Sequence, residues 1–458
     1  MQKQNRRNFV KTTAALGLGL WAGGGVSAAP SRSALEEIAF GCIGIGGKGS
    51  SDSADANDTK RHGSKVVAAC DIDDEALGKV KDKFPGAKHF NDYRKMLEEM
   101  GDSIDAVTVS TPDHTHAVAA LQAMRMGKHC FCQKPLTHSI EEARMMTQVA
   151  REKKVMTQMG NQHTASSTLR LSAALIKAGV IGTVKEVHVW TNRPVWPQSY
   201  GLKVQEPETP PHVHWDEWIG PAKMRPYSPD YHTFKWRGFW DFGTGALGDM
   251  SCHTLNMSYM ALNLRNPTSV TAKTAPHDKN CYPKSSVIEF EFPELDGRPA
   301  LKMFWYDGGE RPNELIADCP KFKKDGKEIT YNSGAVLVGD KGKFFSPGDN
   351  GAEVATTGIV VDGEFTNQLK IENRPDYVAS PGHFKELTDA IRGNGRPMSN
   401  FEDYAGGLTE TNLLGNLAVW TGTRVEWDAE KMIATNNDDE VVKKIVRHDY
   451  RNGYTIHA

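Results

Sequence analysis

Residues 38–49 read IAFGCIGIGGKG, and this stretch decides how the chain begins to fold. An apolar, strand-like run ends at Ile43, and Gly44, Gly46 and Gly49 follow in a G-x-G-x-x-G pattern. The first glycine permits a tight turn, the second lets backbone approach a pyrophosphate, and the third allows close packing of a helix on the strand. Glycine-rich turns are common, so the meaning of this one depends on its surroundings.

The surroundings favour a dinucleotide-binding unit. A second strand is expected over 65–71, and it ends at Asp71, whose carboxylate can accept hydrogen bonds from the adenosine ribose hydroxyls. Asp73 and Asp74 add negative charge where a 2′-phosphate would sit, which favours NAD over NADP. The expected nucleotide-binding residues of this part are Gly44, Gly46, Gly47, Gly49 and Asp71.

Short β-rich runs then alternate with helix-length amphipathic segments, which predicts a doubly wound parallel sheet of the Rossmann type. Beyond residue 162 strand candidates separated by turns predict an open, mainly antiparallel sheet, with helices near the end packing back. We therefore expect an α/β protein with a nucleotide-binding domain over 38–162 and an α+β domain for substrate binding and oligomerisation over 163–458. Further strands are expected at 104–110, 129–132, 154–159, 183–191, 269–275, 286–292, 300–306 and 334–339.

The first 29 residues read as an export signal. Arg6 and Arg7 precede an apolar stretch over 12–26, and small residues lead to a cleavage site near Ala28 or Ala29. The stretch is too short and too rich in glycine to be a stable membrane span. The sequence thus predicts twin-arginine export to the periplasm, a route that carries folded proteins, so a cofactor bound beforehand could travel with the chain. An ordinary basic N-terminus is the alternative.

Composition narrows the function classes. The formal net charge of −2 gives no sign of a nucleic-acid partner. The cysteines number seven, an odd count, and several fall inside expected strands. This pattern is typical of buried thiols rather than of a disulfide framework.

Two further groups carry chemistry. Asp249 and His253 are four residues apart on an expected helix that runs to about Leu264, so both side chains share one face. Histidine suits proton transfer near neutral pH, although such a pair is more often a surface or capping pair. Lys134 follows a strand of the first sheet, where ligands bind, and its ammonium could stabilise an alkoxide beside a nicotinamide.

Together, the glycine-rich pattern, the run STPDHTH over 110–116, the pair Lys134-Pro135 and Asp249/His253 resemble the glucose–fructose oxidoreductase / inositol dehydrogenase / MocA family. The resemblance implies sugar or cyclitol chemistry with NAD(P). It implies Lys134, Asp249 and His253 as the catalytic set, with His253 as acid and base. It also places Thr111, Pro112, His116 and Lys134 beside the cofactor.

One departure from the family stands out. Gln133 replaces the usual Glu before the lysine and removes a carboxylate next to the ammonium.

The pair His114 and His116 has metal-ligand spacing, but no third ligand of clear spacing accompanies it, so no metal site is expected.

Polar and aromatic residues suited to a polyhydroxylated ligand follow the first domain and recur in a long loop over 193–243. Aromatic rings can cover the C–H faces of a pyranose, and arginine can donate to its hydroxyls. A loop of this kind could equally form a subunit interface, and we expect a homo-oligomer. The expected substrate-binding residues are Asn161, Gln162, His163, Arg193, Trp196, Trp236, Arg237 and Trp240.

The leading hypothesis is an NAD-dependent oxidoreductase that acts on a secondary alcohol of a sugar or glycoside. An alternative is a redox-neutral glycosidase that passes through a 3-keto intermediate, with tightly bound NAD regenerated in each turnover. A third is a sugar or nucleotide sensor without catalysis, which the joint presence of Lys134, Asp249 and His253 disfavours.

Overall fold

The computed structural model describes residues 37–349, 351 and 353–457. The expected signal peptide lies outside the described residues. The described residues belong to one compact unit of the chain, Glu37–Ala458. Among them, no helix combines the length and the apolar character that a membrane crossing requires.

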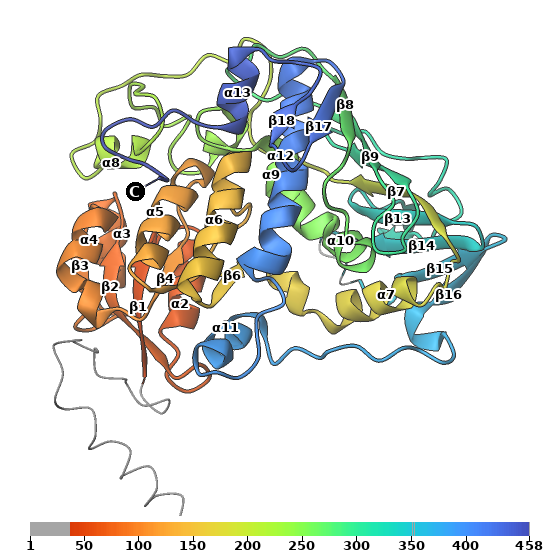
Figure 1. The fold of residues 1–458 in the computed structure, drawn as a ribbon, viewed down its shortest axis with the longest axis horizontal. Helices are drawn as coiled ribbons and strands as arrows, with labels where there is room; N and C mark the ends of the chain where they lie inside the picture. Colours follow the sequence, from red (N-terminus) through yellow and green to blue (C-terminus); the bar gives the residue numbers. More distant parts are fainter. Residues whose placement is uncertain (1–36, 350, 352, 458) are drawn as a thin grey trace, which may run out of the picture. The chain divides into compact units, whose positions relative to one another are not determined.

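A parallel sheet of six strands forms the first half, in the order β3-β2-β1-β4-β5-β6 (Figure 1). Every residue of β1 is buried, as its apolar sequence predicts for a central strand. The doubly wound parallel sheet is therefore confirmed. The strands are β1 (Ile38–Ile43), β2 (Ser64–Cys70), β3 (Lys88–Phe90), β4 (Ala106–Val109), β5 (His129–Cys132) and β6 (Thr157–Met159).

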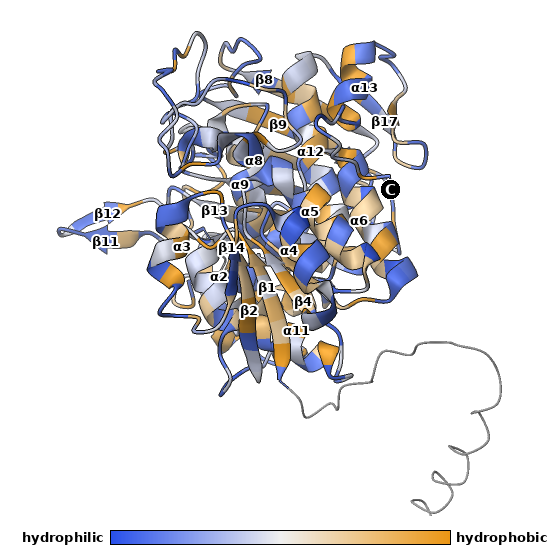
Figure 2. Ribbon diagram, turned by 90° about the vertical axis from the view of Figure 1, so that its left-hand side faces the viewer, coloured by the Kyte–Doolittle hydropathy of each residue, from blue (hydrophilic) through white to orange (hydrophobic). Residues whose placement is uncertain are grey.

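Helices cover both faces of this sheet. One face packs mainly against α2 (Gly49–Ala56), α3 (Asp74–Val80) and α11 (His383–Ile391). The other packs against α4 (Tyr93–Met100), α5 (Asp113–Arg125) and α6 (Ile140–Lys153). Figure 2 shows β1 and β4 largely in hydrophobic colours, as expected for strands between two helical layers.

A second sheet of ten strands follows, in the order β16-β15-β14-β13-β7-β10-β9-β8-β17-β18. Its pairings are antiparallel except that of β7 with β10, so the expected mainly antiparallel sheet is confirmed. The strands are β7 (Val184–Trp190), β8 (Ser269–Thr274), β9 (Ser286–Phe292), β10 (Leu301–Tyr306), β13 (Gly334–Gly339), β14 (Gly342–Pro347), β15 (Gly358–Val361), β16 (Glu364–Asn367), β17 (Val425–Asp428) and β18 (Ile433–Ala434).

One face of this sheet packs on α7 (Ser167–Lys177), α10 (Asn256–Leu262) and α12 (Gly406–Thr421), and α12 also packs on α6 of the first domain. Part of the other face is covered by the segment that holds Ile316 and Cys319. From the same region a hydrophilic hairpin of β11 (Phe322–Lys324) and β12 (Lys327–Ile329) projects (Figure 2).

The long connection between β7 and β8 differs from the expectation in one respect. The single helix expected to run to about Leu264 is broken at Leu255 into α9 (Gly245–Thr254) and α10. Before α9, the connection is irregular apart from α8 (Trp215–Ile219) and a short 3-10 turn over Lys235–Gly238. A last helix, α13 (Glu440–Val446), precedes a tail whose Tyr454 packs beside Tyr93 of α4.

Candidate active site

A lysine from the first sheet meets an aspartate from the second domain. Lys134 lies two residues beyond the end of β5, and its Nζ donates to Oδ1 of Asp249 at 2.6 Å and to the backbone oxygen of Asp249 at 2.9 Å. Both side chains are largely buried. Asp249 comes from α9, so this ion pair joins the two domains at the end of the parallel sheet where ligands bind.

Asp249 is ionised. Burial favours its neutral form, but the positive charges of Lys134 and Arg237 outweigh burial and lower its pKa to about 2. Arg237 Nε lies 3.3 Å from Oδ1 of Asp249. The Arg237 guanidinium lies over the ring of Trp236, 4.2 Å from its centroid, and 4.9 Å from that of Phe234. The two rings restrict the arginine, so the carboxylate has two fixed cationic partners.

His253 lies one helical turn beyond Asp249. It is 8 % exposed, and its Nδ1 has no hydrogen-bond partner among the described residues. Burial, followed by the charge of Lys134, lowers the pKa of His253 well below its usual value. The imidazole is therefore neutral near pH 7 and can accept a proton. The ring of His163 stands edge-on to it, with the centroids 6.2 Å apart.

The glycine-rich turn fits a pyrophosphate. A Cβ at Gly44, where φ is +76°, would lie 2.7 Å from the Ser110 oxygen, and one at Gly49 would lie 2.0 Å from the Gly44 oxygen, so neither position tolerates a side chain. A Cβ at Gly47, in contrast, would meet no atom of the described chain within 4 Å. Packing thus demands two of the glycines, while the space beside Gly47 is open to a ligand.

Asp71 also shapes this turn. Its Oδ2 accepts the backbone N–H groups of Ile45 at 2.9 Å and Gly46 at 3.1 Å, while Oδ1 accepts that of Asp73 at 3.1 Å. Burial raises the pKa of Asp71, and these hydrogen bonds partly offset the rise. The carboxylate therefore holds the glycine-rich turn in addition to the expected role toward a ribose, which stays a prediction.

The turn before α5 is tied to the lysine by His116. One ring nitrogen lies 2.8 Å from the oxygen of Pro135, and the other lies 2.8 Å from that of Thr111, which precedes Pro112. Burial lowers the pKa of His116 to about 4. The neutral ring has one N–H, which donates to one of these two backbone oxygens, so the ring braces the two turns. Direct contacts of Thr111, Pro112 and His116 with the cofactor stay predictions.

The ring of His114 also lies between backbone oxygens, those of Phe242 and Trp218, at 3.2 and 3.0 Å. Its ring nitrogens therefore point at backbone rather than toward a site shared with His116. Among the described residues, no group of three or more His, Cys, Asp or Glu side chains is arranged to hold a metal ion.

The expected substrate-binding residues are divided by the fold. Arg237 lies beside Asp249 and over the ring of Trp236. The positive charge of Arg193 contributes to the lowered pKa of His253. His163 is half-buried beside His253 and Gln162 is exposed, whereas Asn161 is fully buried, and its Oδ1 accepts the hydroxyl of Ser399. Trp196 is buried too, and its Nε1 donates to Gln198 at 2.7 Å.

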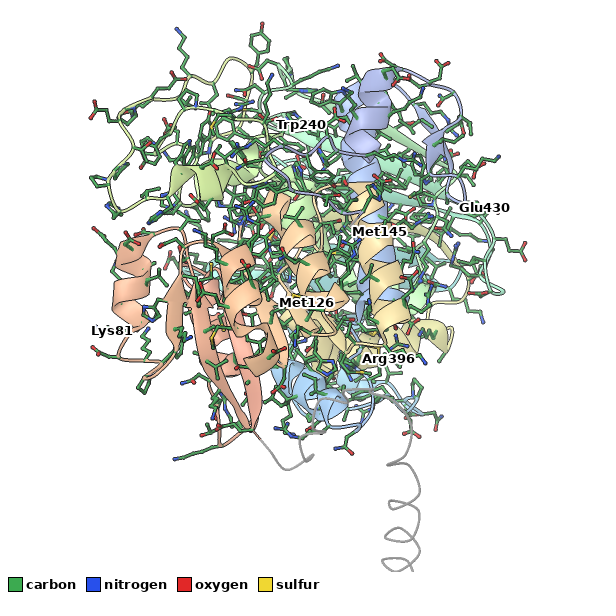
Figure 3. The ribbon with its side chains drawn as sticks, turned by 60° about the vertical axis from the view of Figure 1, so that its left-hand side comes forward. Lys81, Met126, Met145, Trp240, Arg396 and Glu430 are labelled. Atoms are coloured by element: carbon green, nitrogen blue, oxygen red, sulfur yellow. The ribbon has the colours of Figure 1, made fainter. Side chains whose placement is uncertain are left out.

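Trp240 lies elsewhere. It stacks on Tyr282 with the ring centroids 3.7 Å apart and lines a cavity of about 240 Å³ together with His138, His448 and Trp420. Neither Lys134, Asp249 nor His253 lines that cavity. Figure 3 labels Trp240 above the helices that cover the first sheet. The structure does not bring Trp240 together with the catalytic candidates.

Sequence reasoning missed one charged group at this site. Asp113, the first residue of α5, is 4 % exposed and accepts the Thr244 hydroxyl at 2.7 Å. Burial raises its pKa to about 7, although the charges of Arg237 and Lys134 oppose the rise. Its position in the STPDHTH run beside two histidines was the available signal, but no pattern indicates that this aspartate is buried.

Two family models match the chain. The model for the NAD-binding Rossmann fold of an oxidoreductase family covers residues 38–161, and that for the C-terminal alpha/beta domain of the same family covers 169–295. The chain belongs to the glucose–fructose oxidoreductase / inositol dehydrogenase / MocA family. Membership agrees with the six-stranded nucleotide-binding sheet and with the site at its edge.

Proteins with related sequences include levoglucosan dehydrogenase of Pseudarthrobacter phenanthrenivorans, 23% identical over 42% of this chain and 41% of that protein. Inositol 2-dehydrogenase of Rubrobacter xylanophilus is 32% identical over 26% of this chain and 33% of that protein. The chain thus spans a third to two fifths of the length of these two relatives.

Among solved structures, the WlbA dehydrogenase of Bordetella pertussis, in complex with NADH and UDP-GlcNAcA, has a similar fold. Its TM-score is 0.59 at 18% identity, with 86% of this chain and 99% of that chain covered.

Proposed function

We propose that this protein is an NAD-dependent oxidoreductase that converts a secondary alcohol of a sugar or glycoside into a ketone, or runs the reverse reaction. The observation that carries the proposal is the buried cluster of Lys134, Asp249 and His253 at the carboxyl ends of the parallel strands. The names of the sequence relatives, levoglucosan dehydrogenase and inositol 2-dehydrogenase, support a cyclic polyol as substrate.

His253, Lys134 and Asp249 each have a separate role in the proposed alcohol oxidation. Neutral His253 accepts the hydroxyl proton of the substrate, because burial and the charge of Lys134 keep the imidazole unprotonated. The ammonium of Lys134 stabilises the negative charge that develops on the oxygen, and Asp249 fixes that ammonium in place. When NAD is bound, it supplies the acceptor for the hydride. Arg193 and Arg237 donate to further hydroxyls, and Trp236 and Phe234 hold Arg237 in position.

The cofactor in this proposal is NAD rather than NADP. Asp73 at the N-cap of α3 and Asp74 and Glu75 in its first turn follow Asp71, so this end of the site is acidic and opposes a 2′-phosphate. A comparison of the affinities for NADH and NADPH tests the choice, and tighter binding of NADPH would refute it.

We further propose that the cofactor is held tightly, because a segment of the second domain closes against the same turn. Val213 forms a bridge with Asp73, the His212 oxygen accepts the Asp74 N–H at 2.9 Å, and the His214 N–H donates to the Ile72 oxygen at 2.8 Å. The His214 ring lies 3.2 Å from the carboxylate of Asp74. This strap, residues 212–214, restrains the turn that follows Asp71 and so restricts exit of the adenosine end.

Tight binding accords with the proposed export by the twin-arginine machinery, in which the cofactor is bound before transport to the periplasm. The support is the sequence of the leader, with Arg6 and Arg7 before an apolar stretch. Replacement of both arginines by lysine should keep the protein in the cytoplasm. Unchanged recovery from the periplasmic fraction would refute the proposal.

The activity test uses purified protein without added NAD. A sugar substrate should change the absorbance of the bound cofactor once per active site, and further turnover should require an added oxidised cofactor or a second sugar that accepts hydride. Repeated release of aglycone from aryl glycosides without any added acceptor would instead indicate the redox-neutral glycosidase, which the dehydrogenase names of the relatives do not favour. A protein that binds NADH and sugar but transfers no hydride would be a sensor.

A further inference from the structure

One buried carboxylate connects three turns at the edge of the parallel sheet. Asp52, in the first turn of α2, is 2 % exposed. Its Oδ2 accepts the Ser110 hydroxyl at 2.8 Å and the side-chain amide N–H of Gln133 at 2.8 Å, while its Oδ1 accepts the ammonium of Lys48. These partners lie in the turns that follow β4, β5 and β1. The three turns border the region in which a dinucleotide binds in such a sheet.

Gln133 is fixed from both ends of its amide. Its Nε2 donates to Asp52, and its Oε1 accepts the backbone N–H of Lys134 at 3.3 Å. The side chain is buried and lies against Gly160, where a Cβ would approach the amide atoms of Gln133 to 2.5–2.7 Å. Gly160 therefore makes room for this arrangement, and a larger residue there would displace Gln133.

The amide at position 133 matches the charge of Asp52. A glutamate, the usual residue of the family, would place a second carboxylate within hydrogen-bond distance of Asp52 in a buried site. Two such groups repel each other strongly when both are ionised, and a proton shared between them at acidic pH would relieve the repulsion. Glutamine supplies an N–H donor instead, and the pair is satisfied without a shared proton.

We infer that Asp52 is a positioning residue. Through Gln133 it fixes the turn that carries Lys134, and through its other contacts it fixes the turns that border the nucleotide-binding region. Gln133, which departs from the family's Glu, is thus one half of a matched pair whose carboxylate lies on helix α2. The inference rests on the nucleotide-binding domain alone, and it stands whether or not the proposed sugar reaction is correct.

The test exchanges the two groups. We compare Gln133→Glu, Asp52→Asn and the double variant Asp52→Asn/Gln133→Glu, with Asp55→Asn as the matched control. Asp55 lies one turn-length further along the same helix, where its carboxylate is 42% exposed and pairs with Arg61. The readout is the affinity for NADH, measured by fluorescence titration of the stripped protein at pH 5.5 and pH 8, with thermal unfolding as the check of the fold.

Gln133→Glu should weaken NADH binding by about tenfold or more at pH 8 and approach the wild type at pH 5.5, where the two carboxyl groups share a proton. Asp52→Asn should weaken binding at both pH values, since the buried site shared by Lys48, Ser110 and Gln133 then contains no carboxylate. The double variant restores one donor and one carboxylate, and its affinity should return to within about threefold of the wild type at both pH values.

A pH-dependent loss that the second substitution repairs cannot come from a merely structural defect. Affinity of Gln133→Glu equal to the wild type at pH 8 would overturn the inference. A double variant that binds no better than Gln133→Glu, or that fails to fold, would overturn it as well. The test measures only the affinity for NADH, so its outcome does not depend on whether a sugar substrate is found.

Discussion

The ammonium of Lys134 lies 2.6 Å from Oδ1 of Asp249, so that a residue at the end of a nucleotide-binding strand is fixed by a helix of the other domain. Correct placement of the lysine thus requires both domains to be packed together. Substitutions on either side of this contact should affect catalysis.

Replacement of Lys134 by Met should lower kcat for sugar oxidation by about 10²–10³-fold, because the developing alkoxide loses its cationic partner. It also leaves Asp249 with Arg237 as its remaining close cationic partner, so the pKa of that carboxyl should rise. Steady-state kinetics with NAD measure the effect. Lys431→Met, which removes an exposed lysine paired with Asp428, is the control, and turnover of Lys134→Met equal to that control would refute the role.

His253→Asn should lower kcat by about 10²–10⁴-fold, since the variant has no group that accepts the hydroxyl proton. The pKa of His253 in the folded protein lies well below 6.5, so the imidazole of the wild type stays neutral as the pH falls from 8 to 6.5. Protonation of this ring should therefore not lower kcat/KM over that interval. A decline with an apparent pKa near 6.5 that disappears in His253→Asn would contradict this assignment.

Asp113→Asn should stabilise the protein at alkaline pH. In the folded state the pKa of Asp113 is raised from 3.8 to about 7, so the unfolded chain loses this proton first. Stability therefore falls as the pH rises from about 4 to 7 and is constant above the folded pKa. An asparagine does not titrate, and the Tm of the variant should exceed that of the wild type at pH 8 by more than at pH 5. An equal Tm difference at both pH values would refute the prediction.

His214→Pro should speed the release of NADH. Proline removes the N–H that donates to the Ile72 oxygen, and the φ of −83° at this position is close to the value that proline requires. His214→Ala removes only the contact of the ring with Asp74 and serves as the matched control. Stopped-flow displacement of NADH by excess NAD should show a larger rate constant for the proline variant than for the alanine variant. Equal release from the wild type and both variants would show that the strap does not hold the cofactor.

The architecture was predictable wherever the signal is local. The apolar run before Gly44 specifies a buried strand, and alternation of strands with helices specifies the parallel sheet. The spacing of Asp249 and His253 likewise placed them on one face of a helix. The break at Leu255 was not predictable, because Leu255 is a good helix former and the sequence there contains neither Gly nor Pro.

Long-range contacts account for the rest. Gln133 and Asp52 are 81 residues apart, and no local sequence pattern around either residue predicts their contact. Aromatic composition predicted a ligand surface in the loop after β7, but composition does not say which ring faces which cavity. Trp236 is held against Arg237, whereas Trp240, only four residues later, stacks on Tyr282. The outer strands β15 to β18 are too short for an alternating pattern to mark them.

The cysteines add a constraint of a different kind. All seven lie among the described residues, and each is a free, buried thiol, as the odd count predicted. Burial raises the pKa of Cys42 and Cys252 to about 12, so these thiols hardly form the thiolate that reacts with oxidants. That protection exists only once the chain has folded. An unfolded chain would expose an odd number of cysteines, at least one of which must lack an intramolecular partner, so unfolding in oxidising surroundings leads to mispaired or cross-linked molecules. The order of folding and exposure to oxidant therefore decides whether this protein can be recovered in its native form.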